Sequence, residues 1–157
     1  MGILFSVTSL KTERIVVLMK ICQLLHKSSI IADIRASDKK GVLDELSAGI
    51  STATTASAQD IATVLMEREQ LGSTGIGGGV AIPHGKLDKV KSIQVGLGLS
   101  RKGVNYDSLD NKPVHIFFLL LTPANSAGEH LKVLARISQL LKIDQFKKKL
   151  LEAETTD

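Results

Sequence analysis

The most informative segment of this chain runs from Gly72 to Lys86 and reads GSTGIGGGVAIPHGK. Five of its first eight residues are glycine, and a short apolar run and a proline then lead to His84. Glycine admits positive φ and lets other groups approach the backbone closely. Proline fixes its own φ and restricts Ile82, the residue before it, to extended conformations. The segment therefore predicts a glycine-rich loop and a short strand, after which the ring of His84 stands clear of the sheet.

Two common phosphate-binding loops do not fit this segment. The P-loop pattern has four residues between its first glycine and its Gly-Lys pair, followed by Ser or Thr. Here five residues separate Gly79 from Gly85, and Leu87 follows the lysine. The dinucleotide-binding fingerprint has a third small residue where this chain has Val80. The glycines therefore do not indicate a nucleotide site.

A longer pattern that includes this segment resembles a family signature. It starts at Arg68-Glu69, skips two residues and continues as GSTGIG, one further residue and GVAIPHG. This pattern is similar to the active-site signature of the enzyme IIA domains of the bacterial phosphotransferase system. The subtype is the fructose/mannitol type, which includes the stand-alone nitrogen-regulatory IIA proteins, and the similarity extends from about Met19 to the C-terminus. Its first part resembles the nitrogen-type proteins at Leu24, Leu25, Asp33, Ile34, Ala36, Lys39, Val42 and Leu43.

The resemblance implies a phosphotransferase component that carries a phosphoryl group on a histidine. In the family the histidine of Pro-His-Gly is phosphorylated, and His84 matches it. The donor would be a histidine-containing phosphocarrier protein, and no metal, nucleotide or other cofactor is needed. Arg68 and His130 match an arginine and a second histidine that lie beside the acceptor. The loop residues that we expect to bind the phosphoryl group are Ser73, Thr74, Gly79 and Gly85.

The residues themselves leave alternatives for Arg68. A helix is expected from Ser57, as N-cap, to about Leu71, and Arg68 falls on its apolar face. That face consists of Ile61, Val64 and Leu65. A buried guanidinium without a partner is costly, so Arg68 must meet an anion or reach solvent at the helix end. The anion is either a nearby carboxylate or, as the resemblance implies, a phosphoryl group.

The other histidines also have more than one interpretation. A helix is expected from Glu129 to Lys142, with a core face of Leu131, Leu134, Ile137, Ser138 and Leu141. His130 lies in its first turn, where the helix dipole disfavours an imidazolium ion, so we expect a neutral ring. That ring either bonds to a loop carbonyl or lies beside His84 and donates to a phosphoryl oxygen. His115 lies in an apolar run and is expected to be a hydrogen-bonded core or strand-end histidine.

Hydrophobic patterning predicts an α/β fold, a three-layer sandwich in which a mixed sheet has helices on both faces. Strands are expected at residues 29–35, 93–100 and 114–121, the last two antiparallel and the last central. Besides the two helices above, others are expected at residues 19–26, from an N-cap at Ser37 to Gly49, and at 144–152. Gly96 and Gly98 share one face of their strand, which indicates close packing there.

Composition limits the classes of protein that remain. The chain has 157 residues, which suits one domain, and we expect an N-terminal arm or alternative-start extension at 1–18 before a domain at 19–157. Cys22 is the only cysteine, which excludes disulfide frameworks and cysteine zinc sites and fits the reducing cytoplasm. No apolar run approaches a membrane span. The net charge is +4, and the basic residues do not form one basic face. Lys147–Lys149 are expected to be solvated. Nucleic acid is therefore not an expected partner.

Three functions are compatible with these features. The first is the phosphoryl carrier, acting either as a nitrogen-type regulator of other proteins, which we favour, or in a fructose/mannitol-type uptake relay. The second is a metal-binding hydrolase that uses His84, His115 and His130, although no two of these have helical metal-ligand spacing. The third is an interaction module without phosphate transfer, which the presence of His84 disfavours. A partner's histidine must reach His84, and the residues expected at that rim are Ile76, Val80 and Ile82.

Overall fold

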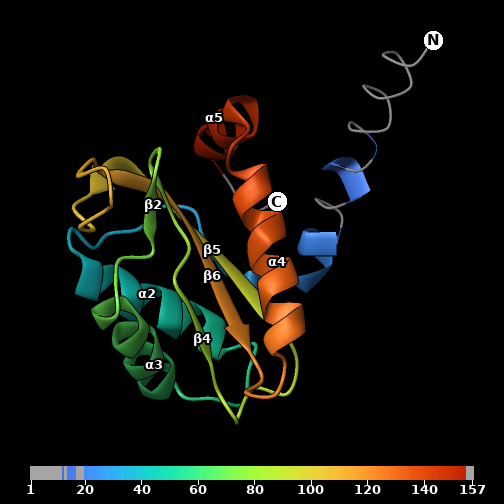
Figure 1. Ribbon diagram of the computed structural model, residues 1–157. Coiled ribbons are helices and arrows are strands. Elements are labelled where there is room, and N and C mark those ends of the chain that lie inside the picture. Colours follow the sequence, from blue (N-terminus) through green and yellow to red (C-terminus); the bar gives the residue numbers. More distant parts are fainter. Residues whose placement is uncertain (1–11, 13, 17–19, 155–157) are drawn as a thin grey trace.

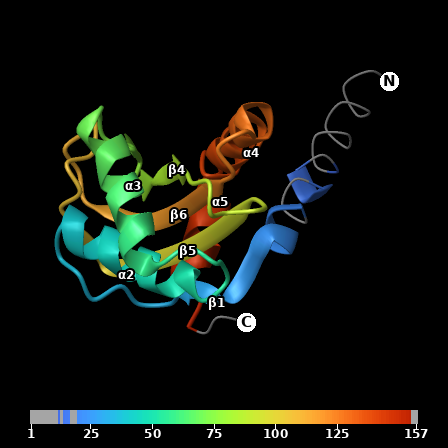
Figure 2. The same ribbon diagram turned by 90° about the horizontal axis from the view of Figure 1, so that it is seen from below.

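The chain folds into three layers in the computed structural model, which describes residues 12, 14–16 and 20–154 (Figure 1). The central layer is a six-stranded sheet. Helices α2 (Lys39–Ser51) and α3 (Ala58–Gln70) cover one face, and α4 (Ala127–Leu140) and α5 (Asp144–Glu152) pack on the other. Figure 2 shows the sheet between the α2–α3 pair and α4. The predicted sandwich with helices on both faces is confirmed.

The sheet is mixed, as the strand pattern predicted. Its order is β1 (Leu25–Ile31), β5 (Gln94–Val104), β6 (Val114–Thr122), β3 (Val80–Ala81) and β2 (Gly75–Gly77). A further short strand, β4 (His84–Lys86), also pairs with β6. β5 and β6 are antiparallel, whereas β6 runs parallel to β3 and β4. The apolar strand β6 is therefore central, with neighbours along both of its edges.

Several predicted boundaries are wrong by a few residues. β1 runs from Leu25 to Ile31 instead of 29–35, because the chain bends after Ile31 and returns to the sheet only through the bond from Ile34 N to Leu99 O (2.7 Å). β5 continues to Val104, which pairs with Val114 beyond an irregularity in the register. Residues 20–24 are helical, and Met19 lies outside the described residues.

The helix starts follow local capping chemistry. Asp38, not the predicted Ser37, caps α2, because its Oδ1 accepts a bond from Gly41 N at 2.8 Å. Ser57 caps α3 as predicted, with its Oγ accepting from Asp60 N at 3.1 Å. At the far end of α3, Gly72 has φ +147°, a conformation that favours glycine and lets the chain leave the helix sharply.

The core-facing side of α4 was predicted correctly only in part. Ile137 and Leu141 are buried as predicted, but Leu131, assigned to the core, is 64% exposed, and Val133 and Leu140, not assigned to it, are buried. Successive helical residues are about 100° apart around the axis, so Leu131 cannot share the face of His130. α5 has the predicted bounds, but Lys147 is not a solvated residue: its Nζ donates to Gly78 O at 3.3 Å.

The close packing predicted at Gly98 is confirmed. A Cβ atom there would lie 2.5 Å from Ile34 Cδ1 and 2.9 Å from Leu46 Cδ2, so α2 lies against the strand only because no side chain intervenes. The core under α2 therefore meets a sheet surface shaped by a small residue. Among the residues that the structure describes, no helix combines the length and apolar character needed to cross a bilayer.

We predict that Gly98→Ala lowers the free energy of unfolding by about 1–3 kcal/mol, because the added methyl group overpacks the α2 face. Urea unfolding followed by circular dichroism measures the change. Gly128→Ala is the matched control, since nothing lies within 4 Å of a Cβ there and alanine favours the helix. Equal stability of Gly98→Ala and the unchanged protein would contradict the packing argument.

Candidate functional site

His84 is held at the start of β4 by pairing with the central strand. It lies opposite Leu120 in the parallel pairing of β4 with β6. The bond from Leu120 N to Pro83 O (3.0 Å) fixes the backbone just before it. The sequence predicted that His84 follows a strand, and the structure instead places it within one. Its half-buried side chain therefore starts from a backbone that the sheet holds in place.

One nitrogen of the His84 ring is already occupied. Nδ1 lies 2.7 Å from the carbonyl oxygen of Ile82. Because a carbonyl oxygen can only accept, Nδ1 carries the proton and Nε2 has the lone pair. Nε2 accepts a bond from Arg68 Nε at 3.3 Å. The nitrogen available for a new covalent bond is therefore Nε2, and it already faces a cation.

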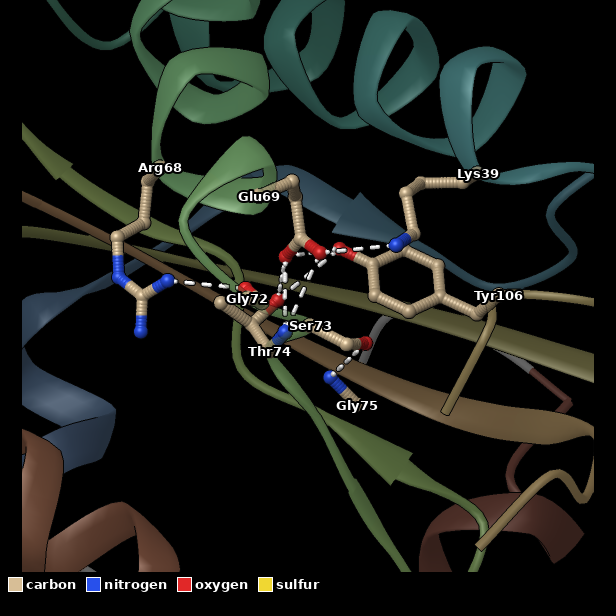
Figure 3. A network of polar contacts seen from close by, with 8 residues as sticks. All are labelled: Lys39, Arg68, Glu69, Gly72, Ser73, Thr74, Gly75 and Tyr106. Atoms are coloured by element: carbon tan, nitrogen blue, oxygen red, sulfur yellow. Dashed lines mark hydrogen bonds and ion pairs between the residues drawn. The ribbon is translucent and has the colours of Figure 1, made fainter. Parts of the chain in front are cut away.

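Arg68 reaches this position from the last turn of α3. Its Nη1 donates to Gly72 O at 3.0 Å, while its Nε is directed to His84. In the described part of the chain Arg68 forms no ion pair, and Glu69, the adjacent carboxylate, points the other way (Figure 3). The alternative that a nearby carboxylate satisfies Arg68 is therefore wrong. Its charge is free to meet an anion at His84.

His130 lies beside His84, although the two are far apart in sequence. The ring centroids are 5.3 Å apart, with an angle of 57° between the ring planes. His130 is the fourth residue of α4 and only 6% exposed. Its Nδ1 is 2.8 Å from the hydroxyl of Thr122, which is fully buried at the end of β6. Nε2 is thus the only ring nitrogen of His130 that remains for another group.

The surroundings keep both rings neutral. Burial, with smaller contributions from the neighbouring His84 and Lys86, lowers the pKa of His130 to about 4. Burial is also the main cause that lowers the pKa of His84, helped by the charge of Arg68 and opposed by the bond to Ile82. At neutral pH the site therefore holds a nucleophilic imidazole, a second neutral imidazole and one guanidinium ion.

The glycine loop contributes less to this site than the sequence predicted. Thr74, expected to bind phosphate, is 3% exposed, and its amide and hydroxyl both donate to the carboxylate of Glu69. The hydroxyl of Ser73 accepts a bond from Gly75 N at 3.1 Å. The loop therefore uses both of these residues to hold its own backbone.

Gly79 and Gly85 also have other roles. Gly79 O accepts bonds from His115 N (2.8 Å) and Ile116 N (3.1 Å), at the opposite end of β6 from His84, so its assignment to phosphate binding is wrong. At Gly85 a Cβ would lie 2.5 Å from Val64 Cγ1. Glycine is therefore required there because α3 packs directly against β4.

The structure separates His115 from the other two histidines. His115 lies five residues before Leu120, the partner of His84, which corresponds to roughly 16 Å along a strand. Its Nδ1 is 2.8 Å from Ser100 O, as expected of a strand-end histidine. A metal site built from the three histidines is therefore wrong, and no group of three or more His, Cys, Asp or Glu residues within the described ranges could hold a metal ion.

Of the three residues expected at the rim around His84, Ile76 is 45% exposed, but Val80 and Ile82 are only 1% and 2% exposed, because they point into the core under α4. The assignment of Val80 and Ile82 to the rim is therefore wrong. Two exposed apolar residues that the sequence analysis missed are Leu71 and Leu109, at 85% and 70%. Leu71 directly follows α3, and Leu109 N bonds to Gly75 O, so both lie on segments next to the loop.

Comparison with known proteins agrees with this geometry. Residues 23–157 match the family model described as phosphoenolpyruvate-dependent sugar phosphotransferase system, EIIA 2. A nitrogen regulatory protein of Bradyrhizobium diazoefficiens is 39% identical over 132 residues, which cover 84% of this chain and 86% of that protein. The fructose-specific EIIABC component of Bacillus subtilis is 38% identical over 140 residues, which cover 88% of this chain but only 22% of that longer protein.

Solved structures agree as well. The nitrogen regulatory protein IIA-Ntr from Neisseria meningitidis superposes with a TM-score of 0.81 and 34% identity, covering 85% of this chain and 92% of that one. The mannitol IIA protein of Escherichia coli shares the fold, with a TM-score of 0.70 and 17% identity over 83% of this chain and 92% of that one. This chain therefore belongs to the EIIA 2 family of the phosphoenolpyruvate-dependent sugar phosphotransferase system, and it is a phosphotransferase component with the family's role of phosphoryl carrier.

Proposed function

We propose that the chain carries its phosphoryl group on Nε2 of His84 and receives it from a phosphohistidine on a histidine-containing phosphocarrier protein in the cytoplasm. The observation that supports this most directly is the bond between His84 Nδ1 and Ile82 O. It leaves the lone pair on Nε2, the nitrogen that also faces Arg68. A neutral, oriented imidazole next to a cation is what attack on an anionic phosphorus requires.

Phosphoryl transfer from the donor histidine to His84 needs neither a general acid nor a general base. The Nε2 lone pair of His84 forms the new P–N bond, the donor's P–N bond breaks, and its electron pair returns to the donor ring. His84 keeps its Nδ1 proton throughout, and the carbonyl of Ile82 stabilises the positive charge that the ring acquires. Because one P–N bond replaces another, the group can also be passed onward.

Arg68 and His130 would stabilise the phosphoryl group in different ways. Arg68 supplies a full charge at Nε2 of the acceptor, where the phosphoryl oxygens arrive. His130 supplies a hydrogen bond from Nε2–H if the Thr122 hydroxyl donates to its Nδ1, and Thr122 has the right position for this. The phosphoryl group would then lie between a guanidinium ion and a neutral imidazole.

A nitrogen-type regulatory role is the finer part of the proposal. It is supported by relatives named nitrogen regulatory protein, one of which is 39% identical and is covered over 86% of its length. In this role the phosphorylation state would change the binding of protein targets. The alternative is a sugar relay, which the 38% identity to a fructose-specific protein supports. In that case a IIB component would accept the group.

Domain bounds of 1–18 and 19–157 remain a prediction, since most of residues 1–18 lie outside the described ranges.

The first test is a mass measurement. Incubation with phosphoenolpyruvate, enzyme I and the histidine phosphocarrier should add one acid-labile phosphoryl group to the chain. His84→Ala should add none, and His115→Ala, the matched control at the other end of β6, should add one. A His84→Ala protein that still gains the group would refute the assignment.

The second test separates acceptance from transfer. Arg68→Ala should slow acceptance roughly ten- to a hundredfold, the cost of losing one hydrogen bond to a charged group. His130→Ala should still accept phosphate but pass it on poorly, and Thr122→Val should reproduce part of that defect at nearly unchanged shape. Rapid-quench measurement of both half-reactions gives the rates. A His130→Ala protein with normal onward transfer would show that the ring contact has no direct role.

The third test is pH dependence. Acceptance requires neutral His84, and its pKa is lowered below the ordinary 6.5. More than half of the imidazole should therefore be in the reactive neutral form at pH 6.5, and that fraction should fall as the pH is lowered further. An NMR titration of the His84 ring protons measures the midpoint without a donor protein, and His130 should titrate near pH 4. A His84 midpoint at or above 6.5 would contradict the account.

A further inference from the structure

Glu69 is a buried carboxylate that the mechanism above does not use. It follows Arg68 in α3 but is only 6% exposed and points away from Arg68, toward Thr74, Tyr106 and Lys39 (Figure 3). Burying a carboxylate is costly unless donors surround it. A residue of this kind next to the acceptor's cation must therefore be held by strong local contacts.

Four donors from three segments converge on this carboxylate. Thr74 N donates at 3.1 and 3.2 Å to its two oxygens, and the Thr74 hydroxyl contacts Oε1. The hydroxyl of Tyr106, a fully buried residue, donates to Oε1 at 3.0 Å. Lys39 Nζ, from the start of α2, lies 3.1 Å from Oε2. Glu69 therefore joins α3 to the glycine loop, to α2 and to the segment after β5.

The loop segment that Glu69 holds is also bonded to the residues on either side of the site, His84 and Arg68. Thr74 O accepts a bond from Ile82 N at 3.0 Å, and Ile82 O in turn accepts from Nδ1 of His84 at 2.7 Å. On the other side, Gly72 O accepts from Nη1 of Arg68 at 3.0 Å. His84 and Arg68 are thus both bonded to a segment that Glu69 fastens at Thr74.

The loop requires such fastening because of its composition. A chain that includes Gly72, Gly77, Gly78 and Gly79, all at positive φ, has many conformations to lose on ordering. A misplacement of about 1 Å in a reacting group is enough to slow a transfer strongly. Lys39 has a second effect, since its charge offsets that of Glu69, so that the carboxylate does not repel the incoming phosphoryl group.

We propose that Glu69 is a positioning residue for phosphoryl transfer: its contacts with Thr74, Tyr106 and Lys39 hold the loop in the geometry that directs Arg68 and His84 toward one phosphoryl group. The proposal rests on the proposed function of His84. It assigns no contact between Glu69 and the phosphoryl group itself. Its effect therefore passes through Arg68 and through the backbone of Ile82.

The test uses Glu69→Gln, which keeps the shape but places an amide donor among the four donors. Acceptance on His84 should slow at least tenfold. In the Arg68→Ala background the same change should slow acceptance by a clearly smaller factor, because part of its route is already removed. Equal factors in the two backgrounds would overturn the proposal, as would a folded Glu69→Gln protein that accepts phosphate at the normal rate.

A spectroscopic measurement distinguishes positioning from general stability and needs no phosphorylation. The Arg68 Nε–H and the His84 ring signals of the unphosphorylated protein should shift or broaden in Glu69→Gln. Glu45→Gln is the matched control, since Glu45 accepts bonds from Arg35 N and Ala36 N in a loop that does not contact His84. It should leave both signals and the rate unchanged, and unchanged signals in Glu69→Gln would overturn the proposal.

Thr74→Val decides the matter if Glu69→Gln does not fold. It removes only the hydroxyl donor and keeps the backbone bond, so acceptance should slow a few-fold with the same shifts at Arg68 and His84. A normal rate and normal signals in Thr74→Val would overturn the proposal. If the unchanged protein gains no phosphoryl group on His84, the proposed function fails instead, and the signals of Arg68 and His84 still test whether Glu69 positions them.

Discussion

The carboxyl end of β6 fixes the relative position of the two histidines, and the rest of the site depends on it. His84 lies opposite Leu120, and Thr122, two residues further on, contacts the ring of His130. Residues two apart on a strand point to the same face. Because β6 is buried on both faces and paired along both edges, these two attachment points cannot move apart. A 5.3 Å separation of the rings is therefore set by the core and not by flexible side chains.

The site around His84 and His130 carries positive charge. Arg68 and Lys86 supply positive charge beside two rings whose pKa values are lowered, chiefly by burial. Glu69, one of the two carboxylates that flank Arg68 in sequence, is turned away and paired with Lys39. A phosphoryl group would bring a compensating negative charge. Burial and these positive charges keep the two rings neutral before transfer. The same positive charges would attract the phosphoryl anion during transfer.

The sequence was sufficient to predict the residues whose roles follow from a local pattern. His84, Arg68 and His130 lie close together, as the resemblance to the family implied, and the mixed sheet was predicted from the antiparallel pairing expected of the strands at 93–100 and 114–121. The errors concern the direction in which side chains point, which depends on how elements far apart in the sequence pair and pack. Val80 and Ile82 were assigned to an exposed rim, but Val80 lies in β3, between β2 and β6, Ile82 directly follows it, and both side chains pack in the core under α4.

Tyr106 and Thr122 could not be found from local patterns. The hydroxyl of Tyr106 bonds to Glu69, which lies 37 residues away in the sequence. No residue near Tyr106 in the sequence indicates that its hydroxyl is buried. Thr122 ends an apolar strand and reads as the start of a loop, so its contact with His130 becomes visible only once α4 packs on the sheet. Polar partners inside a core are specified by the packing of whole elements, which a one-dimensional pattern does not record.

The structure also changes the meaning of the glycine-rich segment. Its three consecutive glycines, residues 77–79, all have positive φ and form the turn between β2 and β3, far from His84. Lys147 of α5 closes that turn from the other side of the sheet by donating to Gly78 O. The proposed phosphoryl site would use only the two ends of the segment, at Gly72 and at His84. The glycines are therefore abundant because the chain must reverse tightly between α3, which carries Arg68, and β4, which carries His84. The groups proposed to bind phosphate come from the elements on either side of that turn.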